Sequence, residues 1–342
     1  MALESKDETM LIIGAGGYIG THLVRKALDK GYKIKALDRF FFGKDKLDKS
    51  AKHPELKIID QDIRSVTAET FQDVDIVVSL AGISNDPACD LDPELTRSIN
   101  YEGIVHSAKT AKEAGVPKYV EMSSCSVYGS SDKVCDEESP RKPVSLYAEM
   151  KTRVEDDIFA LADKNFALTA FRNSTAFGIS DRMRFDLVVN IMSLCAQHDG
   201  YIRVFGTGEQ WRPFIHVEDI ADATLHILNQ DPSLWSGEVF NLGACTMDVN
   251  AIAKTVREAL NEIGVPIQIQ YVPEDVDPRN YAVSFEKFLD RFTFRPRHKI
   301  EDTVKDIFTG LANGNIREDP TCYTVKFYQS LIEKYGSSLL LS

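Results

Sequence analysis

The sequence lacks several features that would assign it to a specialised class. No apolar run approaches the roughly 18 residues that a membrane span requires, and no two cysteines stand at CxxC spacing. Lys and Arg number 40 against 52 Asp and Glu, and this net charge of −12 argues against nucleic acid or an anionic membrane as a partner. An anionic small ligand stays open, because a few local arginines can override the overall sign. The scattered cysteines are typical of reduced thiols rather than of disulfides or a zinc site: Cys89, Cys125, Cys135, Cys195, Cys245 and Cys322.

What remains is an ordinary globular composition, with 43% hydrophobic and 27% charged residues and no internal repeat. A chain of 342 residues suits one large α/β domain or two smaller ones. The first ten residues are acidic and polar, so we expect no signal peptide and a cytoplasmic protein.

A glycine cluster near the start carries the first functional signal. The apolar run Met10–Ile13 predicts a buried strand, and helical spacing of apolar residues follows the cluster. Between them, Gly14, Gly17 and Gly20 stand three residues apart, with Tyr18 and Ile19 between the last two. This arrangement is typical of a loop that lets a pyrophosphate approach a helix N-terminus. The alternative is a structural turn; strand, spacing and helix together favour dinucleotide binding.

An acidic residue at the end of the next strand refines this prediction. The strand Tyr32–Leu37 leads into Asp38, about 20 residues after the glycines, where a carboxylate can accept hydrogen bonds from ribose hydroxyls. This favours NAD over NADP, although Arg39 could accommodate a 2′-phosphate. The alternative for Asp38 is a turn residue at a strand end.

Further strands complete a parallel sheet. We predict strands at 56–59, 75–81, 119–122 and 166–171, with Asp62 and Ile63 placed to meet the adenine and with Leu80, Ala81 and Gly82 passing close to the ligand. The stretch Ser84–Pro93, which includes Asn85, is either a loop that lines a substrate pocket or plain surface. A helix is predicted from Asn100 to about 114.

A tyrosine and a lysine four residues apart give the catalytic signal. Tyr147 and Lys151 fall on one face of a predicted helix, and Ser124 lies at the carboxyl end of the strand before it. A free tyrosine is a poor base at neutral pH, but a nearby ammonium and the positive ring of NAD⁺ favour its phenolate. Ser124 can hydrogen-bond the same substrate oxygen. A solvated helix face is the alternative for the Tyr-x-x-x-Lys pattern taken alone.

Together these motifs resemble the extended short-chain dehydrogenase/reductase family, whose members mostly act on nucleotide sugars. The resemblance covers nearly the whole chain and rests on GAGGYIG (14–20), Asp38, Asp62-Ile63, LAG (80–82), NYEG (100–103), SSCSVYG (123–129), YAEMK (147–151), RNSTAFG (172–178), FDLVVN (185–190) and GTGEQWRPFIHVED (206–219). It implies bound NAD and a doubly wound α/β fold with a seven-stranded parallel sheet and a smaller α/β substrate domain. It also implies a homodimer through a four-helix bundle, here the helices near 101–114 and 147–163.

The resemblance also divides the chain and assigns further residues. Residues 1–175, with 213–244 returning, form the NAD-binding domain; 176–212 and 245–330 form the substrate domain, and 331–342 a tail. Asn100 and Ser123 join the cofactor site. The resemblance assigns a set of side chains to the substrate: Ser84, Asn85, Ser124, Ser126, Thr175, Asn190, Arg212 and Arg279. Arg182 and Arg184 either join this site or lie on a solvated loop, and we interpret His216 as structural.

Two positions after Ser124 bear on the reaction. Related dehydratases carry an Asp-Glu pair there and uronic-acid decarboxylases a glutamate, whereas this chain has Cys125 and Ser126. Epimerisation at C4 through a transient 4-keto sugar needs no extra acid or base, so it is favoured, with Tyr147 as the base. Cys125 could supply chemistry at C5 or C3 if its thiol were activated, or it could simply pack beside the pocket.

Other activities stay open at this level. They are a 4,6-dehydratase, a dehydrogenase or reductase with net cofactor turnover, and a non-catalytic NAD-binding regulatory protein. The last is disfavoured because Ser124, Tyr147 and Lys151 are all present. No metal site is predicted.

Overall fold

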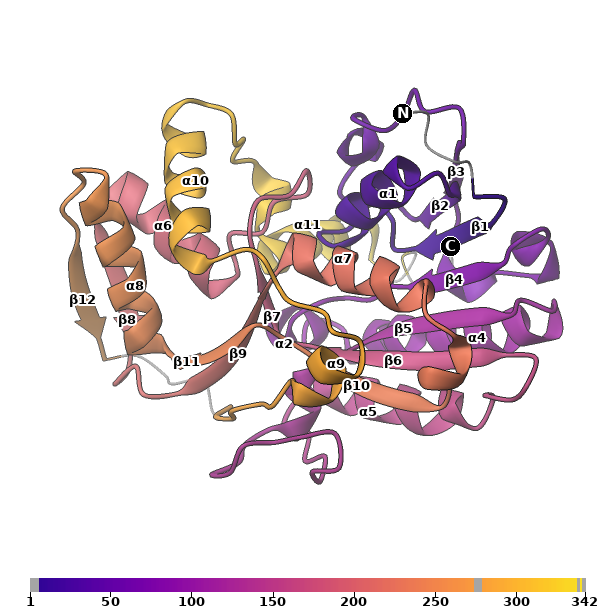
Figure 1. The fold of residues 1–342 in the computed structure, drawn as a ribbon. Coiled ribbons are helices and arrows are strands. Elements are labelled where there is room, and N and C mark those ends of the chain that lie inside the picture. Colours follow the sequence, from indigo (N-terminus) through magenta and orange to yellow (C-terminus); the bar gives the residue numbers. More distant parts are fainter. Residues whose placement is uncertain (1–5, 274–278, 337–338, 340–342) are drawn as a thin grey trace.

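A seven-stranded parallel sheet forms the centre of the computed structural model, which describes residues 6–273, 279–336 and 339 (Figure 1). Every neighbouring pair is parallel, in the order β10-β6-β5-β4-β1-β2-β3. The strands are β1 (Thr9–Ile13), β2 (Lys33–Asp38), β3 (Leu56–Asp60), β4 (Ile76–Ser79), β5 (Lys118–Ser124), β6 (Ala167–Asn173) and β10 (Glu238–Leu242). The predicted doubly wound α/β fold is confirmed.

Helices cover both faces of this sheet, as Figure 1 shows for α1 and α7 on one side and α4 and α5 on the other. One apolar core joins the sheet to α1 (Gly20–Asp29), α7 (Val217–Leu228) and α9 (Glu286–Arg291). A second core joins the opposite face to α4 (Ile104–Glu113), α5 (Leu146–Phe159) and α11 (Thr324–Tyr335). Strands buried on both sides explain the near-continuous apolar runs of β1 and β4.

The strand order reverses beside β1. From β1 the chain winds outward to β2 and β3, then crosses back to place β4 on the other side of β1. The connections that leave β1 and β4 therefore run to opposite faces, and a crevice opens at the carboxyl ends of these two strands. Ligands of doubly wound sheets bind at such a point.

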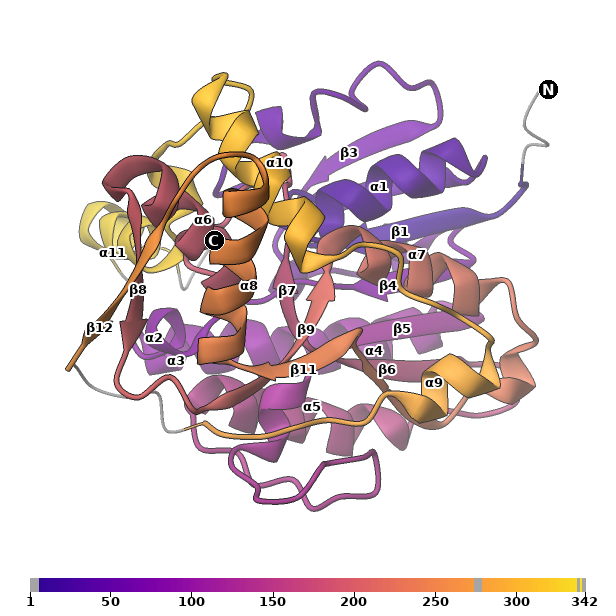
Figure 2. The same cartoon turned by 60° about the vertical axis from the view of Figure 1, so that its left-hand side comes forward.

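A smaller α/β part lies beside the large sheet (Figure 2). Strands β7 (Thr175–Phe177), β9 (Trp211–His216) and β11 (Cys245–Asp248) make one small sheet, and β8 (Tyr201–Phe205) pairs with β12 (Gln268–Val272). The helices α6 (Val188–Asp199), α8 (Val249–Glu262) and α10 (Ile300–Ala312) pack against these strands around a third apolar core. Pro213–His216 thus lies in a small sheet, and α7 brings the chain back to the large one.

The structure differs from the sequence prediction between β4 and α4. The stretch Ser84–Pro93 is not a continuous loop, because α2 (Asp86–Cys89) forms within it and the Asn85 side chain caps its N-terminus. The helix predicted from Asn100 begins earlier, with α3 (Pro93–Arg97) capped by Asp92. A π-helical turn, Ser98–Gly103, then joins α3 to α4. Both caps precede a proline in the first turn, a pattern that starts helices.

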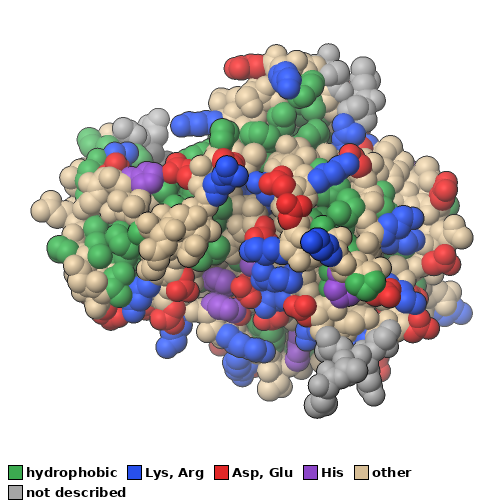
Figure 3. All heavy atoms as spheres, turned by 90° about the horizontal axis from the view of Figure 1, so that it is seen from above, with side chains coloured by type: hydrophobic (Ala, Val, Ile, Leu, Met, Phe, Trp, Pro, Cys, Tyr) green, Lys and Arg blue, Asp and Glu red, His purple; other side chains and the backbone are tan. Residues whose placement is uncertain are grey.

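All six cysteines are free thiols. No helix in the described part of the chain combines the length and apolarity needed to cross a bilayer. On the face seen in Figure 3, basic and acidic side chains are interspersed rather than gathered by sign.

Candidate active site

A cavity of about 740 Å³ opens at the carboxyl ends of β1, β4 and β5, between the large sheet and the smaller α/β part. Most of the residues that the sequence assigned to cofactor or substrate line this one space. They are Gly14, Gly17, Tyr18, Ile19, Gly20, Asp38, Arg39, Asp62, Ile63, Leu80, Ala81, Gly82, Ser84, Asn85, Ser123, Ser124, Ser126, Tyr147, Lys151, Thr175, Arg212 and Arg279.

The glycine loop forms a cradle that has no room for side chains. Gly14 has φ +88°, and a Cβ there would lie 2.8 Å from Leu80 C and Ala81 N. A Cβ on Gly20 would collide with the Gly14 carbonyl oxygen. The loop therefore presents bare backbone at the start of α1, which fits the pyrophosphate of a dinucleotide.

Carboxylates mark the adjacent strand ends. Asp38, at the end of β2, accepts hydrogen bonds from Gly16 N at 2.9 Å and Phe40 N at 2.7 Å. Burial raises the pKa of Asp38, and these N–H groups oppose the shift by stabilising the carboxylate. Asp62 accepts from the Arg64 backbone and guanidinium and lies 3.8 Å from Arg39 Nε. A carboxylate placed beside the cradle fits the ribose of NAD, and Arg39 here faces Asp62.

Tyr147, Lys151 and Ser124 come together on the opposite wall. Tyr147 and Lys151 lie one turn apart on α5, and Ser124 ends β5. Burial raises the pKa of the Tyr147 hydroxyl, while the Lys151 ammonium and the Ser124 side chain lower it. Without cofactor, burial raises the pKa of Tyr147 by more than Lys151 lowers it, so Tyr147 is a phenol at neutral pH.

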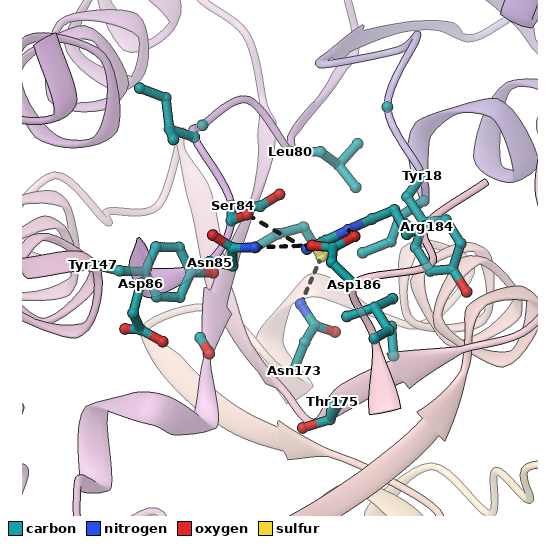
Figure 4. A pocket seen from close by; sticks show the side chains of 18 of the residues that line it. Tyr18, Leu80, Ser84, Asn85, Asp86, Tyr147, Asn173, Thr175, Arg184 and Asp186 are labelled. Carbon is teal, nitrogen blue, oxygen red and sulfur yellow. Dashed lines mark hydrogen bonds and ion pairs between the residues drawn. The ribbon is translucent and has the colours of Figure 1, made fainter. Parts of the chain in front are cut away.

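A polar cluster lies between Tyr147 and the smaller part (Figure 4), and it includes two carboxylates that the sequence prediction missed, Asp86 and Asp186. Asp86 accepts from the Ser145 hydroxyl and forms an ion pair with Arg279. Asn85 Nδ2 donates to Asp186 at 2.8 Å, and Arg184 Nε donates to the same carboxylate at 3.1 Å. Asn85 caps α2, and this local signal could have predicted from the sequence that a helix starts at Asp86.

Arg182 and Arg184 are both buried, so the alternative that they lie on a solvated loop is wrong. Arg184 is bound to Asp186 inside the cavity lining. Arg182 is 2% exposed; it lies 3.8 Å from the centre of the Phe42 ring and donates to the Thr324 hydroxyl. Helix α11 thereby reaches the cavity, and its Tyr328 is part of the lining.

Three assigned residues do not line the cavity. Cys125 is 1% exposed, its thiol donates to the Arg172 carbonyl at 3.0 Å, and burial raises its pKa far above the usual range. This argues against the catalytic alternative and for the packing one. Asn100 uses its amide to hold both backbone groups of Ile83. Asn190 bonds Gly178 N, the Tyr18 hydroxyl and the Arg184 carbonyl. Asn100 and Asn190 therefore support the walls of the cavity without lining it.

Two further residues of strand β9 were named from the sequence, and of these Arg212 lines the cavity. Arg212, 7% exposed, donates to the Trp211 carbonyl and faces the Tyr281 ring at 5.7 Å. His216 accepts from Glu218 N at the start of α7 and stacks on His298 at 4.1 Å. Burial lowers the pKa of His216 to about 4. It is a neutral structural group, as predicted. Asp277 and Pro278, which directly precede Arg279 in the sequence, lie outside the described residues.

Comparison with known proteins agrees with this geometry. Residues 10–243 match the model of the NAD dependent epimerase/dehydratase family. The chain is 27% identical to a UDP-glucose 4-epimerase of Lactobacillus helveticus, over 86% of this chain and 94% of the relative. It is 25% identical to a dTDP-D-glucose 4,6-dehydratase of Bos taurus, over 88% of each.

Among solved structures, the fold is similar to a UDP-N-acetylglucosamine 4-epimerase from Methanobrevibacter ruminantium M1 in complex with UDP-N-acetylmuramic acid. The TM-score is 0.80 at 23% identity, with 90% of this chain and 99% of that one covered. The family match along residues 10–243 agrees with the glycine cradle and with the carboxylate of Asp38 beside it. The chain belongs to the NAD-dependent epimerase/dehydratase family and is an enzyme that uses NAD.

Proposed function

We propose that this protein interconverts two nucleotide sugars that differ in configuration at C4, with Tyr147 as both the base and the acid. One observation carries the proposal. The cavity brings Tyr147, Lys151 and Ser124 together, while positions 125 and 126 offer it no carboxylate. Cys125 faces the Arg172 carbonyl, and Ser126 adds only a hydroxyl. Oxidation and reduction at one carbon need no further acid–base group.

In the first half-reaction Tyr147 takes the proton from the C4 hydroxyl, and Ser124 holds the same oxygen by a hydrogen bond. Bound NAD, which Gly14, Gly17 and Asp38 would hold, would supply the hydride acceptor at C4 and, once reduced, the hydride donor for the 4-keto sugar. Tyr147 then gives its proton back to the new alkoxide oxygen, so no proton is gained or lost overall. Lys151 favours the phenolate during the first half.

The same cavity suggests how the substrate is held. Arg212 and Arg279 carry planar guanidinium groups suited to paired hydrogen bonds with a diphosphate. We assign Thr175 to the sugar side, because it lines the cavity, and Asn190 to support of the wall that the diphosphate faces.

One observation favours a second candidate, dehydration. Asp86 is a carboxylate in the cavity lining, and its charge acts on Tyr147. It could remove a proton beside the 4-keto group, as a dehydratase requires. Its ion pair with Arg279 and its bond from Ser145 instead tie both oxygens to the protein, which favours a binding role.

A product analysis separates these activities. The purified protein is mixed with a panel of nucleotide sugars without added cofactor, and products are read by mass and by chromatographic separation of isomers. A new isomer of unchanged mass is expected. Loss of water that disappears in Asp86→Asn would replace epimerisation by dehydration. Steady formation of NADH from added NAD would indicate a dehydrogenase.

The role of Tyr147 is tested by Tyr147→Phe, which should lower kcat by about 10²–10⁴-fold. Tyr32→Phe is the matched control. Tyr32 directly precedes β2, accepts a hydrogen bond from Lys6, and does not line the cavity. Equal activity of the two variants would remove Tyr147 from the mechanism.

The homodimer and the cytoplasmic location stay predictions. Helices α4 and α5 pack side by side, as each half of a four-helix bundle would. Light scattering coupled to size-exclusion chromatography should give the mass of two chains. A mass of one chain would contradict the predicted homodimer.

A further inference from the structure

A carboxylate stands in the middle of the central strand β5. Glu121 is fully buried, although strands covered on both faces are normally apolar. Side chains alternate along a strand, so Tyr119, Glu121 and Ser123 share the face that α5 covers. Ser123 donates to Glu155 of α5, and Glu121 meets Lys151 of α5. Two polar residues of this face, Glu121 and Ser123, therefore each have a partner on α5.

The partner of Glu121 is the lysine assigned to catalysis. Lys151 Nζ lies 3.0 Å from Glu121 Oε1 and 2.6 Å from the Met122 carbonyl oxygen. A lysine ammonium has three N–H donors, and strand β5 accepts two of them. The third remains for the side where Lys151 lines the cavity together with Tyr147. Glu121 is absent from that lining, so substrate does not touch it.

These contacts have an electrostatic consequence. Lys151 by itself would pull Tyr147 strongly toward phenolate, but the carboxylate 3.0 Å behind the ammonium offsets its field. We propose that Glu121 is a positioning residue that holds Lys151 against β5 and offsets part of its charge, so that Lys151 alone does not ionise Tyr147 and the added charge of the cofactor ring decides whether Tyr147 keeps its proton. The inference rests on the proposed role of Tyr147.

The other titratable groups around Tyr147 do not restore a positive field. From α2, Asp86 and Cys89 both act to raise the pKa of Tyr147. From α5 and β6, Glu155 and Arg172 form a buried pair of their own at 2.7 Å. From the segment before α6, Arg184 is bound to Asp186. The pKa of Tyr147 accordingly lies above its ordinary value, chiefly because of burial.

This arrangement suits a residue that must work in both directions. A permanent phenolate would take the sugar proton well but would return it poorly. With the charge of Lys151 partly offset, Tyr147 loses its proton readily beside the positive oxidised ring and holds it beside the neutral reduced ring.

The test compares Glu121→Gln, which removes the charge, with Glu121→Asp, which keeps it. Ionisation of Tyr147 is followed in cofactor-free protein by tyrosinate absorbance, as the difference between each protein and its Tyr147→Phe version. Glu121→Gln should move the titration to lower pH by about one unit, and Glu121→Asp should leave it near the parent value. The acidic limb of the pH profile of kcat should move in the same direction in Glu121→Gln alone.

Glu155→Gln is the matched control, because it removes another buried carboxylate on this face that pairs with Arg172. An equal shift in Glu155→Gln, or an unchanged titration in Glu121→Gln, would overturn the proposal. If Glu121→Gln does not fold, Glu121→Asn removes the same charge and keeps an amide oxygen that can accept a hydrogen bond from Lys151 Nζ. The titration uses no substrate, so its result stands apart from the turnover of Tyr147→Phe, which decides the proposed function.

Discussion

Replacing Lys151 by methionine should destabilise the protein as well as inactivate it. The Lys151 side chain is 5% exposed and that of Glu121 is 0% exposed, so the variant leaves a carboxylate buried without its counter-charge. Breaking a buried ion pair from one side costs about 3–5 kcal/mol of unfolding free energy. With an unfolding entropy of about 2.1 cal/mol/K per residue over 342 residues, this is a fall in Tm of about 4–7 °C.

The double variant Lys151→Met, Glu121→Met should regain most of that stability. Two apolar side chains of similar length then fill the space between β5 and α5, and such replacements are commonly neutral or stabilising. Its activity should stay as low as that of the single variant, because Tyr147 still lacks the ammonium. Thermal unfolding followed by circular dichroism, with turnover measured on the same samples, gives both quantities. A single variant as stable as the parent, or a double variant no more stable than the single one, would refute the assignment of an ion pair here.

Three other perturbations have defined outcomes. Gly14→Ala should weaken NAD binding measured by calorimetry, because the new Cβ would meet Leu80 and Ala81; Gly264→Ala, also at positive φ but with no atom within 4 Å, should bind NAD normally. Asp38→Ala should reduce the preference for NAD over NADP by removing the carboxylate that would repel a 2′-phosphate; unchanged selectivity would move that role elsewhere. Burial lowers the pKa of His22 and His216 to about 4, so the unfolded chain takes up protons first as pH falls from 6.5. Stability should therefore decline between pH 6.5 and 4, by at most about 3 kcal/mol per histidine, and His216→Gln should flatten part of the Tm profile.

The cofactor half was largely readable from sequence, because its signals are local. The run predicted at Met10–Ile13 became β1 (Thr9–Ile13), and the strand predicted at 166–171 became β6 (Ala167–Asn173). Glycines, strand ends and the Tyr147–Lys151 spacing each depend on residues a few positions apart. Helix starts at Asn85 and Asp92 were missed, although each residue caps a helix with a proline in its first turn.

The substrate side was harder, because its contacts join distant segments. Asp86 meets Arg279, Asn85 meets Asp186, and Tyr328 of α11 reaches the lining near Phe42. No local pattern connects residues so far apart in the chain. The two alternatives for Cys125 stayed open in the sequence for a related reason. The direction of a side chain after a strand end depends on the neighbouring strand, here on the Arg172 carbonyl of β6.

Glu121 is a case that sequence could have signalled. A lone acid within an apolar central strand is costly unless a base pairs with it, and the helix that follows supplies one in Lys151. Stability does not explain why the pair is there, because well-packed apolar residues would serve a buried strand–helix contact as well or better. One member of the pair lines the cavity beside Tyr147 and the other lies behind it, out of reach of substrate. The remaining explanation is control of the charge next to Tyr147, and the Glu121→Gln and Glu121→Asp titrations measure that charge directly.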